Sequence, residues 1–117
     1  MIARFERWLD AAADQQTAVY NHVPSAMTDE QWAGYVQRNL HQAHVELGEV
    51  AQELPLRPWR GPVGRPDAEA RQRAIVETVD ALCFISNYLF ALGVTDEELN
   101  EAYAKKVRYT TERDGGA

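Results

Sequence analysis

The sequence predicts an all-α protein with a single domain over residues 1–117, built as a bundle of four to five helices. Two observations carry this prediction. No segment alternates apolar and polar residues with the period of two that is typical of a half-buried strand. Two capping-box patterns, T-x-x-Q from Thr28 and T-x-x-E from Thr95, indicate where helices begin.

The first two helices follow from apolar spacing. A helix is expected over about residues 2–20, and Pro24 ends it. A second helix opens after Thr28 and continues to Pro55. The apolar positions that predict the first helix are Ile2, Phe5, Leu9 and Ala12, and those of the second are Leu40, Ala43, Leu47, Val50, Ala51 and Leu54.

A stiff loop separates these helices from the rest, because residues 55–66 hold four prolines and two glycines. A third helix is expected over about residues 66–92, with Gly93 as its C-terminal cap. A fourth helix opens at Thr95, and the terminal RDGGA is expected to fray. The fourth helix has one face made of Leu99, Ala102, Tyr103 and Lys106.

Composition indicates a globular protein rather than one that binds a nucleic-acid polymer or a membrane. The net charge of -6 argues against a surface for a nucleic-acid polymer. Cys83 is the single cysteine, which fits a reducing cytoplasm, and the first residues do not resemble a signal peptide. The longest apolar stretch contains Glu77, Asp80 and Asn87, so no membrane span is expected.

Two pairs of carboxylates stand beside apolar stripes. Glu46 and Glu49 lie three residues apart in HVELGEVAQE, and Glu77 and Asp80 have the same spacing in the third helix. If these helices pack antiparallel across the 55–66 loop, the four carboxylates converge and suit Mg²⁺, or alternatively Mn²⁺. The other interpretation is that the acids face solvent or a docking partner. Magnesium commonly takes phosphate oxygens as its remaining ligands, so the cluster suggests a polyphosphate substrate.

Basic side chains gather near the end of the chain, at Lys105, Lys106, Arg108 and Arg113. They can contact phosphate oxygens, or they can simply favour the dipole at a helix C-terminus.

These patterns together resemble the all-α nucleoside triphosphate pyrophosphohydrolases, a superfamily that includes the MazG proteins and the dimeric dUTPases and dCTPases. The likeness covers roughly residues 40–113. It rests on E46-x-x-E49 followed after residues 50–76 by E77-x-x-D80, on HVELGEVAQE and Trp59, on VDALCFIS, and on AYAKK followed by Arg113.

The resemblance implies a role for each matched position. Glu46, Glu49, Glu77 and Asp80 would hold magnesium, and Glu49 would also orient or deprotonate the attacking water. Lys106, Arg113 and Tyr103 would hold phosphate oxygens. Three further residues are candidates for contacting the nucleoside. Trp59 either stacks on a base or packs on the bundle, Asn87 either faces the base or forms a helix-to-helix hydrogen bond, and Gln16 belongs to the glutamine-rich first helix.

The predicted function is therefore Mg²⁺-dependent hydrolysis of a (deoxy)nucleoside triphosphate to the monophosphate and pyrophosphate, with a dUTP- or dCTP-type substrate favoured. A purine substrate and a non-catalytic helical interaction module are the alternatives. A homodimer or homotetramer is expected, because one small bundle cannot surround a helix that is apolar on every side. The side chains in question are Ile75, Leu82, Phe84, Ile85, Tyr88, Leu89 and Phe90.

Overall fold

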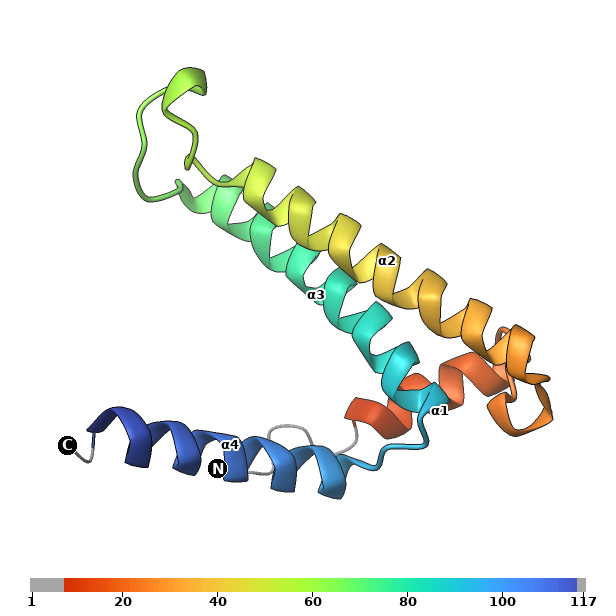
Figure 1. Cartoon of the computed structure of the whole chain (residues 1–117). Coiled ribbons are helices and arrows are strands. Elements are labelled where there is room, and N and C mark those ends of the chain that lie inside the picture. Colours follow the sequence, from red (N-terminus) through yellow and green to blue (C-terminus); the bar gives the residue numbers. More distant parts are fainter. Residues whose placement is uncertain (1–7, 116–117) are drawn as a thin grey trace.

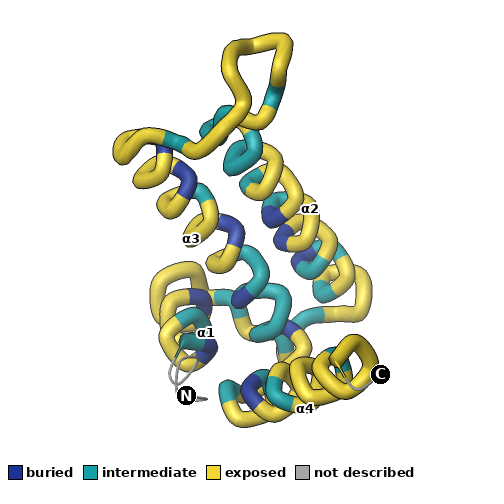
Figure 2. Tube along the Cα trace, turned by 90° about the vertical axis from the view of Figure 1, so that its left-hand side faces the viewer, coloured by how far each residue is buried: buried dark blue, intermediate teal, exposed yellow. Residues whose placement is uncertain are grey.

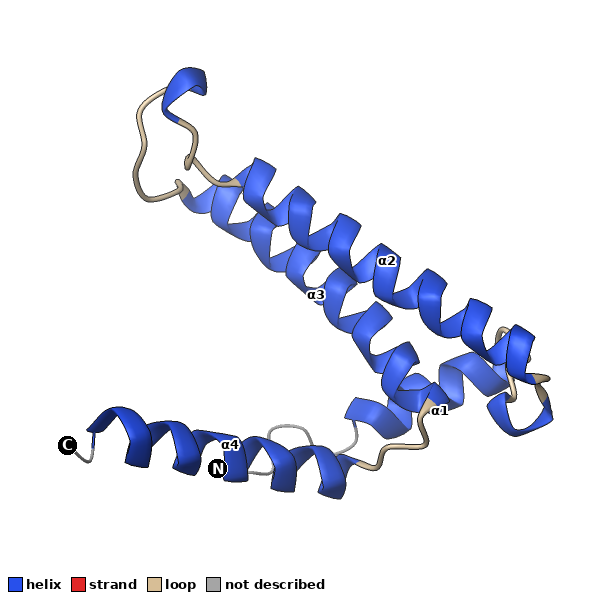
Figure 3. Cartoon of the chain, viewed as in Figure 1, coloured by secondary structure: helices blue, strands red, loops and turns tan. Residues whose placement is uncertain are grey.

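The computed structural model describes residues 8–115, and this part of the chain is helical with no strand (Figure 3). The all-α prediction is confirmed. In chain order the elements are α1 (Trp8–Ala18), the 3₁₀ turn η2 (Pro24–Ala26), α2 (Asp29–Glu53), the 3₁₀ turn η3 (Pro58–Arg60), α3 (Ala68–Ala91) and α4 (Asp96–Gly115). The predicted first-helix positions Ile2 and Phe5 lie outside the described residues.

Three predicted helix ends, at Thr28, Thr95 and Gly93, are confirmed. Thr28 and Gln31 form a reciprocal capping box, with the Gln31 amide donating to Thr28 Oγ1 at 3.1 Å and the Thr28 amide donating to Gln31 Oε1 at 2.9 Å. The amide of Glu98 donates to Thr95 Oγ1 at 3.1 Å in the same way. Gly93, with φ of 71°, ends α3 in the left-handed conformation that glycine adopts without strain.

Two predicted ends were less accurate. The third helix begins at Ala68 rather than Pro66, because the Asp67 side chain accepts a hydrogen bond from the Ala70 amide and caps it. The fourth helix continues through Gly115, so part of the segment expected to fray is helical.

The four helices do not close into a bundle within one chain. Figure 1 shows α2 and α3 as a long antiparallel hairpin, with α1 packed near the end of α3 and α4 projecting away from the hairpin. The Trp32 indole donates to the Ala91 carbonyl at 2.9 Å and joins the start of α2 to the end of α3. The Asp96 carboxylate joins α4 to α1 by accepting the Leu9 amide at 2.9 Å. Because α4 contacts mainly α1, most of its charged length lies away from the hairpin.

The seam between α2 and α3, meaning the facing sides of these helices, is narrow and partly polar. Its buried residues on α2 are Tyr35, Asn39 and Ala43, and those on α3 include Ala74 and Ala81. Small side chains on α3 let the two backbones approach closely, which leaves larger aliphatic side chains on the outside. Figure 2 shows the buried positions confined to narrow stripes along the helices.

The predicted core of α2 is therefore wrong at two positions. Leu40 and Leu47 are 39% and 51% exposed, because α2 turns its Tyr35–Asn39–Ala43 stripe toward α3 instead. Of the seven apolar residues that the sequence analysis assigns to all sides of α3, none is fully buried, and Ile75 and Leu82 are 39% and 38% exposed.

By length and composition alone, α3 is also able to cross a membrane. The core helix of a soluble protein meets the same criterion, so the expected absence of membrane contact stays a prediction.

Candidate functional site

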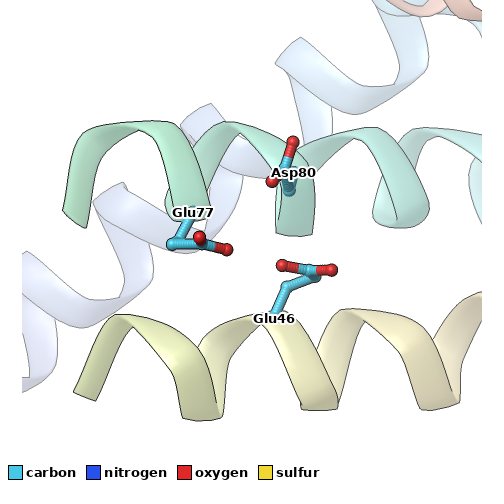
Figure 4. A group of neighbouring side chains, drawn as sticks. All are labelled: Glu46, Glu77 and Asp80. Carbon is cyan, nitrogen blue, oxygen red and sulfur yellow. The ribbon is translucent and has the colours of Figure 1, made fainter. Parts of the chain in front are cut away.

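Three of the four predicted carboxylates meet across the seam. Glu46 lies on α2, and Glu77 and Asp80 lie one turn apart on α3; Figure 4 shows Glu46 and Glu77 between the two helices and Asp80 beside them on α3. One oxygen of each carboxylate lies within 4.8 Å of the other two. The antiparallel packing predicted from the loop and the two i, i+3 pairs thus brings acids from both helices together.

Two features show that this cluster is electrostatically unsatisfied. The Oε2 atom of Glu46 is buried and has no hydrogen-bond partner among the described residues. The pKa of Glu77 is raised to about 7. The largest cause is hydrogen bonding of the protonated carboxyl group to Glu46 and then to Glu49, and burial and the negative charges of both glutamates raise the pKa further. A carboxyl group that keeps its proton to this pH is one whose neighbours repel its charge.

Glu49 borders the cluster without belonging to the group of three. It lies close enough to Glu77 to raise that pKa, one turn along α2 from Glu46. Glu53, the next acid along the same side of α2, is neutralised by Arg73, whose Nε lies 2.6 Å from its carboxylate. The acidic stripe in HVELGEVAQE therefore has two parts, an end at Glu53 that is paired with Arg73 and a part at Glu46 and Glu49 that has no ion pair within residues 8–115.

The donor set fits a hard divalent cation. It consists only of carboxylate oxygens, which Mg²⁺, Mn²⁺ and Ca²⁺ prefer over the softer ligands that zinc takes. The buried Glu46 oxygen that lacks a donor is an acceptor for which a cation is a natural partner. Glu46, Glu77 and Asp80 would hold the ion, and Glu49 is placed to bind it or to act beside it.

A polar network lies further along the same seam, around Gln16 of α1. The Gln16 side chain is 5% exposed, and its Oε1 accepts a hydrogen bond of 2.6 Å from the Tyr35 hydroxyl. His22 Nδ1 lies 2.9 Å from the same oxygen, and its ring packs edge-on against Tyr35. Burial, partly offset by the charge of Arg38, raises the pKa of Tyr35 to about 12, so its hydroxyl stays a donor at neutral pH.

Two asparagines continue this network toward the carboxylates. Asn87 of α3 donates from Nδ2 to Asn39 Oδ1 at 3.0 Å, and Asn39 donates from Nδ2 to the Tyr35 carbonyl at 2.8 Å. The helix-to-helix hydrogen bond that the sequence analysis leaves open for Asn87 is thus present. These side chains, with Gln16, Gln42 and Phe84, line an open pocket of about 480 Å³.

The pocket and the carboxylate cluster are consecutive parts of one seam. Along α2 the relevant positions are 35, 39, 42, 46 and 49, and along α3 they are 77, 80, 84 and 87. Spacings of three and four residues keep each set on one side of its helix. Asn39 precedes Glu46 by seven residues, which is a rise of about 10 Å along α2.

The remaining predicted substrate contacts lie elsewhere in the chain. Tyr103, Lys106 and Arg113 lie on the projecting helix α4, where Lys106 and Arg113 are 5.6 and 5.8 Å from the centre of the Tyr109 ring. Trp59 lies in η3 and is 80% exposed, so it does not pack on the bundle. A single chain therefore does not bring these four residues to the carboxylates.

Sequence reasoning missed the contribution of α2 to the pocket. Tyr35, Asn39 and Gln42 precede Glu46 at spacings of three and four residues, so they lie on the same side of the helix as this candidate metal ligand. That spacing was enough to predict that they line the site. His22 carries no such signal, because it lies outside the helical repeat, in the turn after α1, where its amide also donates to the Gln16 carbonyl at 2.8 Å.

Comparisons of the chain with models of protein families, with curated proteins and with solved structures find no match.

Proposed function

We propose that the protein is a divalent-cation-dependent nucleoside triphosphate pyrophosphohydrolase that releases a monophosphate and pyrophosphate, with a pyrimidine substrate such as dUTP or dCTP favoured over a purine. The observation that carries this proposal is the shared seam. An amide-lined pocket lies about 10 Å along α2 from a carboxylate cluster, so a nucleoside in the pocket can direct its phosphates toward the acids.

The carboxylates would hold Mg²⁺ or Mn²⁺ through Glu46, Glu49, Glu77 and Asp80. A bound cation would supply charge stabilisation at the phosphate oxygens. The unpaired Glu46 oxygen and the raised pKa of Glu77 support this role, because both report negative charge that no protein cation neutralises among the described residues. In contrast, Glu53 already has Arg73 as its partner.

Glu49 is the proposed general base. Its carboxylate borders the cluster rather than sitting inside the group of three, so it can accept a proton from a water molecule that attacks the phosphate chain. The amide groups of Gln16, Asn39 and Asn87 can donate to and accept from the edge of a base, which suits an uncharged heterocycle.

A second copy of the chain completes the proposed enzyme, as a homodimer or homotetramer of the MazG and dimeric dUTPase type. The hairpin leaves apolar side chains exposed on both helices, among them Leu47 at 51% and Val79 at 50%. The projecting α4 offers Lys106 and Arg113 to a neighbouring copy rather than to its own carboxylates. Packing of the outer faces of two hairpins would bury the exposed apolar side chains, and it would bring Lys106 and Arg113 of one copy to the substrate of the other.

A panel of nucleoside triphosphates with Mg²⁺ tests the proposal. We expect pyrophosphate, rather than orthophosphate, to be released most rapidly from dUTP or dCTP, and no release in the presence of EDTA. Fastest turnover of a purine nucleotide would replace the pyrimidine assignment. An absence of turnover across the panel with Mg²⁺ or Mn²⁺ would refute the enzyme and favour a helical interaction module whose exposed apolar faces bind another protein.

A further inference from the structure

The loop between α2 and α3 is a preformed structure at the tip of the hairpin (Figure 1). Its prolines at positions 55, 58, 62 and 66 restrict the backbone before any ligand binds. The Gly64 amide donates to the Pro55 carbonyl at 3.0 Å and closes the loop on itself, while the Arg60 amide donates to the Arg57 carbonyl at 3.0 Å within η3. A ligand that binds here meets side chains on a rigid frame and loses little affinity to loop ordering.

This loop borders an open pocket of about 540 Å³ that is separate from the amide-lined pocket. Three arginines line it, Arg57, Arg60 and Arg65, and none of them forms an ion pair within residues 8–115. Arg57 is half-buried, and the other two are exposed.

The two acids in the pocket wall are already engaged. Glu53 is paired with Arg73 at 2.6 Å, and the Asp67 carboxylate accepts the Ala70 amide at 2.8 Å as the cap of α3. Neither acid therefore forms an ion pair with the three arginines, which outnumber the two acids of the pocket although the chain as a whole carries a charge of -6. Positive charge concentrated in one pocket of an acidic protein calls for a small anion, since an anionic polymer would also meet the repulsive field of the rest of the surface.

We propose that the 55–66 loop is a binding site for a small oligophosphate, either free or carried by a nucleotide, distinct from the carboxylate cluster. Guanidinium groups bind phosphate oxygens through paired hydrogen bonds, and three of them can surround one oligophosphate. The N-terminus of α3, which adjoins the pocket at Asp67 and Ala70, adds a favourable dipole. Glu53 at the pocket and Glu46 in the cluster are separated by a rise of about 10 Å along α2, so the two sites can be occupied and tested independently.

Isothermal titration calorimetry on the full chain in EDTA tests this site without any contribution from a metal. The probes are inorganic tripolyphosphate and dUTP, titrated at constant ionic strength. We expect tripolyphosphate to bind the parent protein, and the double variant Arg57→Gln/Arg60→Gln to bind it at least tenfold more weakly. The exposed Arg71→Gln on α3, outside the pocket, is the matched control and should bind as the parent does.

The same titrations separate the two sources of phosphate. Equal affinity for both probes identifies the phosphate chain as the whole ligand. The other result is that dUTP binds more tightly than tripolyphosphate, and that its affinity falls to that of tripolyphosphate in Trp59→Ala. This result identifies a nucleotide whose base stacks on the exposed indole. Arg65→Gln, a change at an exposed position, provides a second test if the double variant does not fold.

The site would be overturned by an absence of binding at millimolar tripolyphosphate, by unchanged binding in the arginine variants, or by tighter binding of a single-stranded oligonucleotide than of either probe. The Glu46→Gln variant keeps this inference distinct from the proposed enzyme. Loop binding should persist in Glu46→Gln even though turnover is lost.

Discussion

Asn87 of α3 donates a hydrogen bond of 3.0 Å to the side-chain oxygen of Asn39 on α2. This bond is one polar contact of the extensive α2–α3 packing, and it satisfies the buried side chain of Asn39. With Asn39 opposite Asn87, Glu46 meets Glu77 and Asp80 further along the seam. The amide contact of the pocket and the carboxylate cluster thus belong to the same pairing of the two helices.

The stability of the metal-free protein should fall as the pH rises toward neutrality. The pKa of Glu77 is about 7 in the folded protein and 4.5 as its ordinary value. The folded state holds this proton more tightly, so the contribution to stability is complete below about pH 4.5 and is lost as the pH rises to about 7. Melting temperatures measured in EDTA across this range should fall, and the fall should be smaller in Glu77→Gln. Glu69→Gln, an exposed change in the first turn of α3, should keep the slope of the parent, and equal slopes in all three proteins would contradict the prediction.

Removing a single carboxylate should abolish turnover and leave the fold intact. We expect Asp80→Asn and Glu49→Gln to lower kcat by at least about 100-fold, since even a partner of a metal ligand is worth 10–100-fold. In EDTA both variants should be at least as heat-stable as the parent, because one of several crowded negative charges is gone. Mg²⁺ should raise the melting temperature of the parent but not that of Asp80→Asn. Full activity in either variant would remove that residue from the proposed site.

The amide-lined pocket around Gln16, Asn39 and Asn87 should contribute to substrate binding more than to the chemical step. In Asn87→Ala the substrate loses one hydrogen-bond partner in the pocket, which weakens its binding by about 1 kcal/mol or slightly more. KM should therefore rise about five- to tenfold with kcat nearly unchanged. The exposed Gln37→Ala on α2 is the control and should leave both constants as they are. An Asn87→Ala enzyme that loses kcat with an unchanged KM would place Asn87 among the residues that act on the phosphates instead.

Self-association should depend on the outer faces of the hairpin. Light scattering should give at least twice the chain mass of 13.2 kDa for the parent protein. Leu47→Gln and Val79→Gln remove exposed apolar groups without adding charge, so they should shift the protein toward the monomer. Val63→Gln changes a side chain that is 56% exposed but lies in the loop, and it should not alter the mass. A parent protein that is monomeric at micromolar concentration would refute the proposed assembly.

The sequence by itself determined the helices and their ends. Thr28 with Gln31, Thr95 with Glu98, and Gly93 define helix ends through bonds to neighbours within a few residues, so local sequence was sufficient to predict them. It also predicted a convergence of the carboxylates, on the condition that the two helices pack antiparallel across the proline-rich loop, and the structure brings Glu46, Glu77 and Asp80 together.

Only the tertiary structure decided which side of each helix faces inward. Leu40 and Leu47 have the spacing of a core stripe, yet α2 buries Tyr35 and Asn39 instead. Apolar spacing identifies a face that avoids water, but it does not say whether the same chain or another molecule covers that face.

The position of α4 and the pocket around Gln16 were also decided by tertiary structure. Asp96 attaches α4 to α1, and Tyr35 of α2 reaches Gln16 of α1, through contacts that no helical period encodes. Local spacing was therefore enough to predict the carboxylate cluster, which lies within one hairpin, whereas the pocket beside it depends on a third helix whose docking only the folded chain specifies.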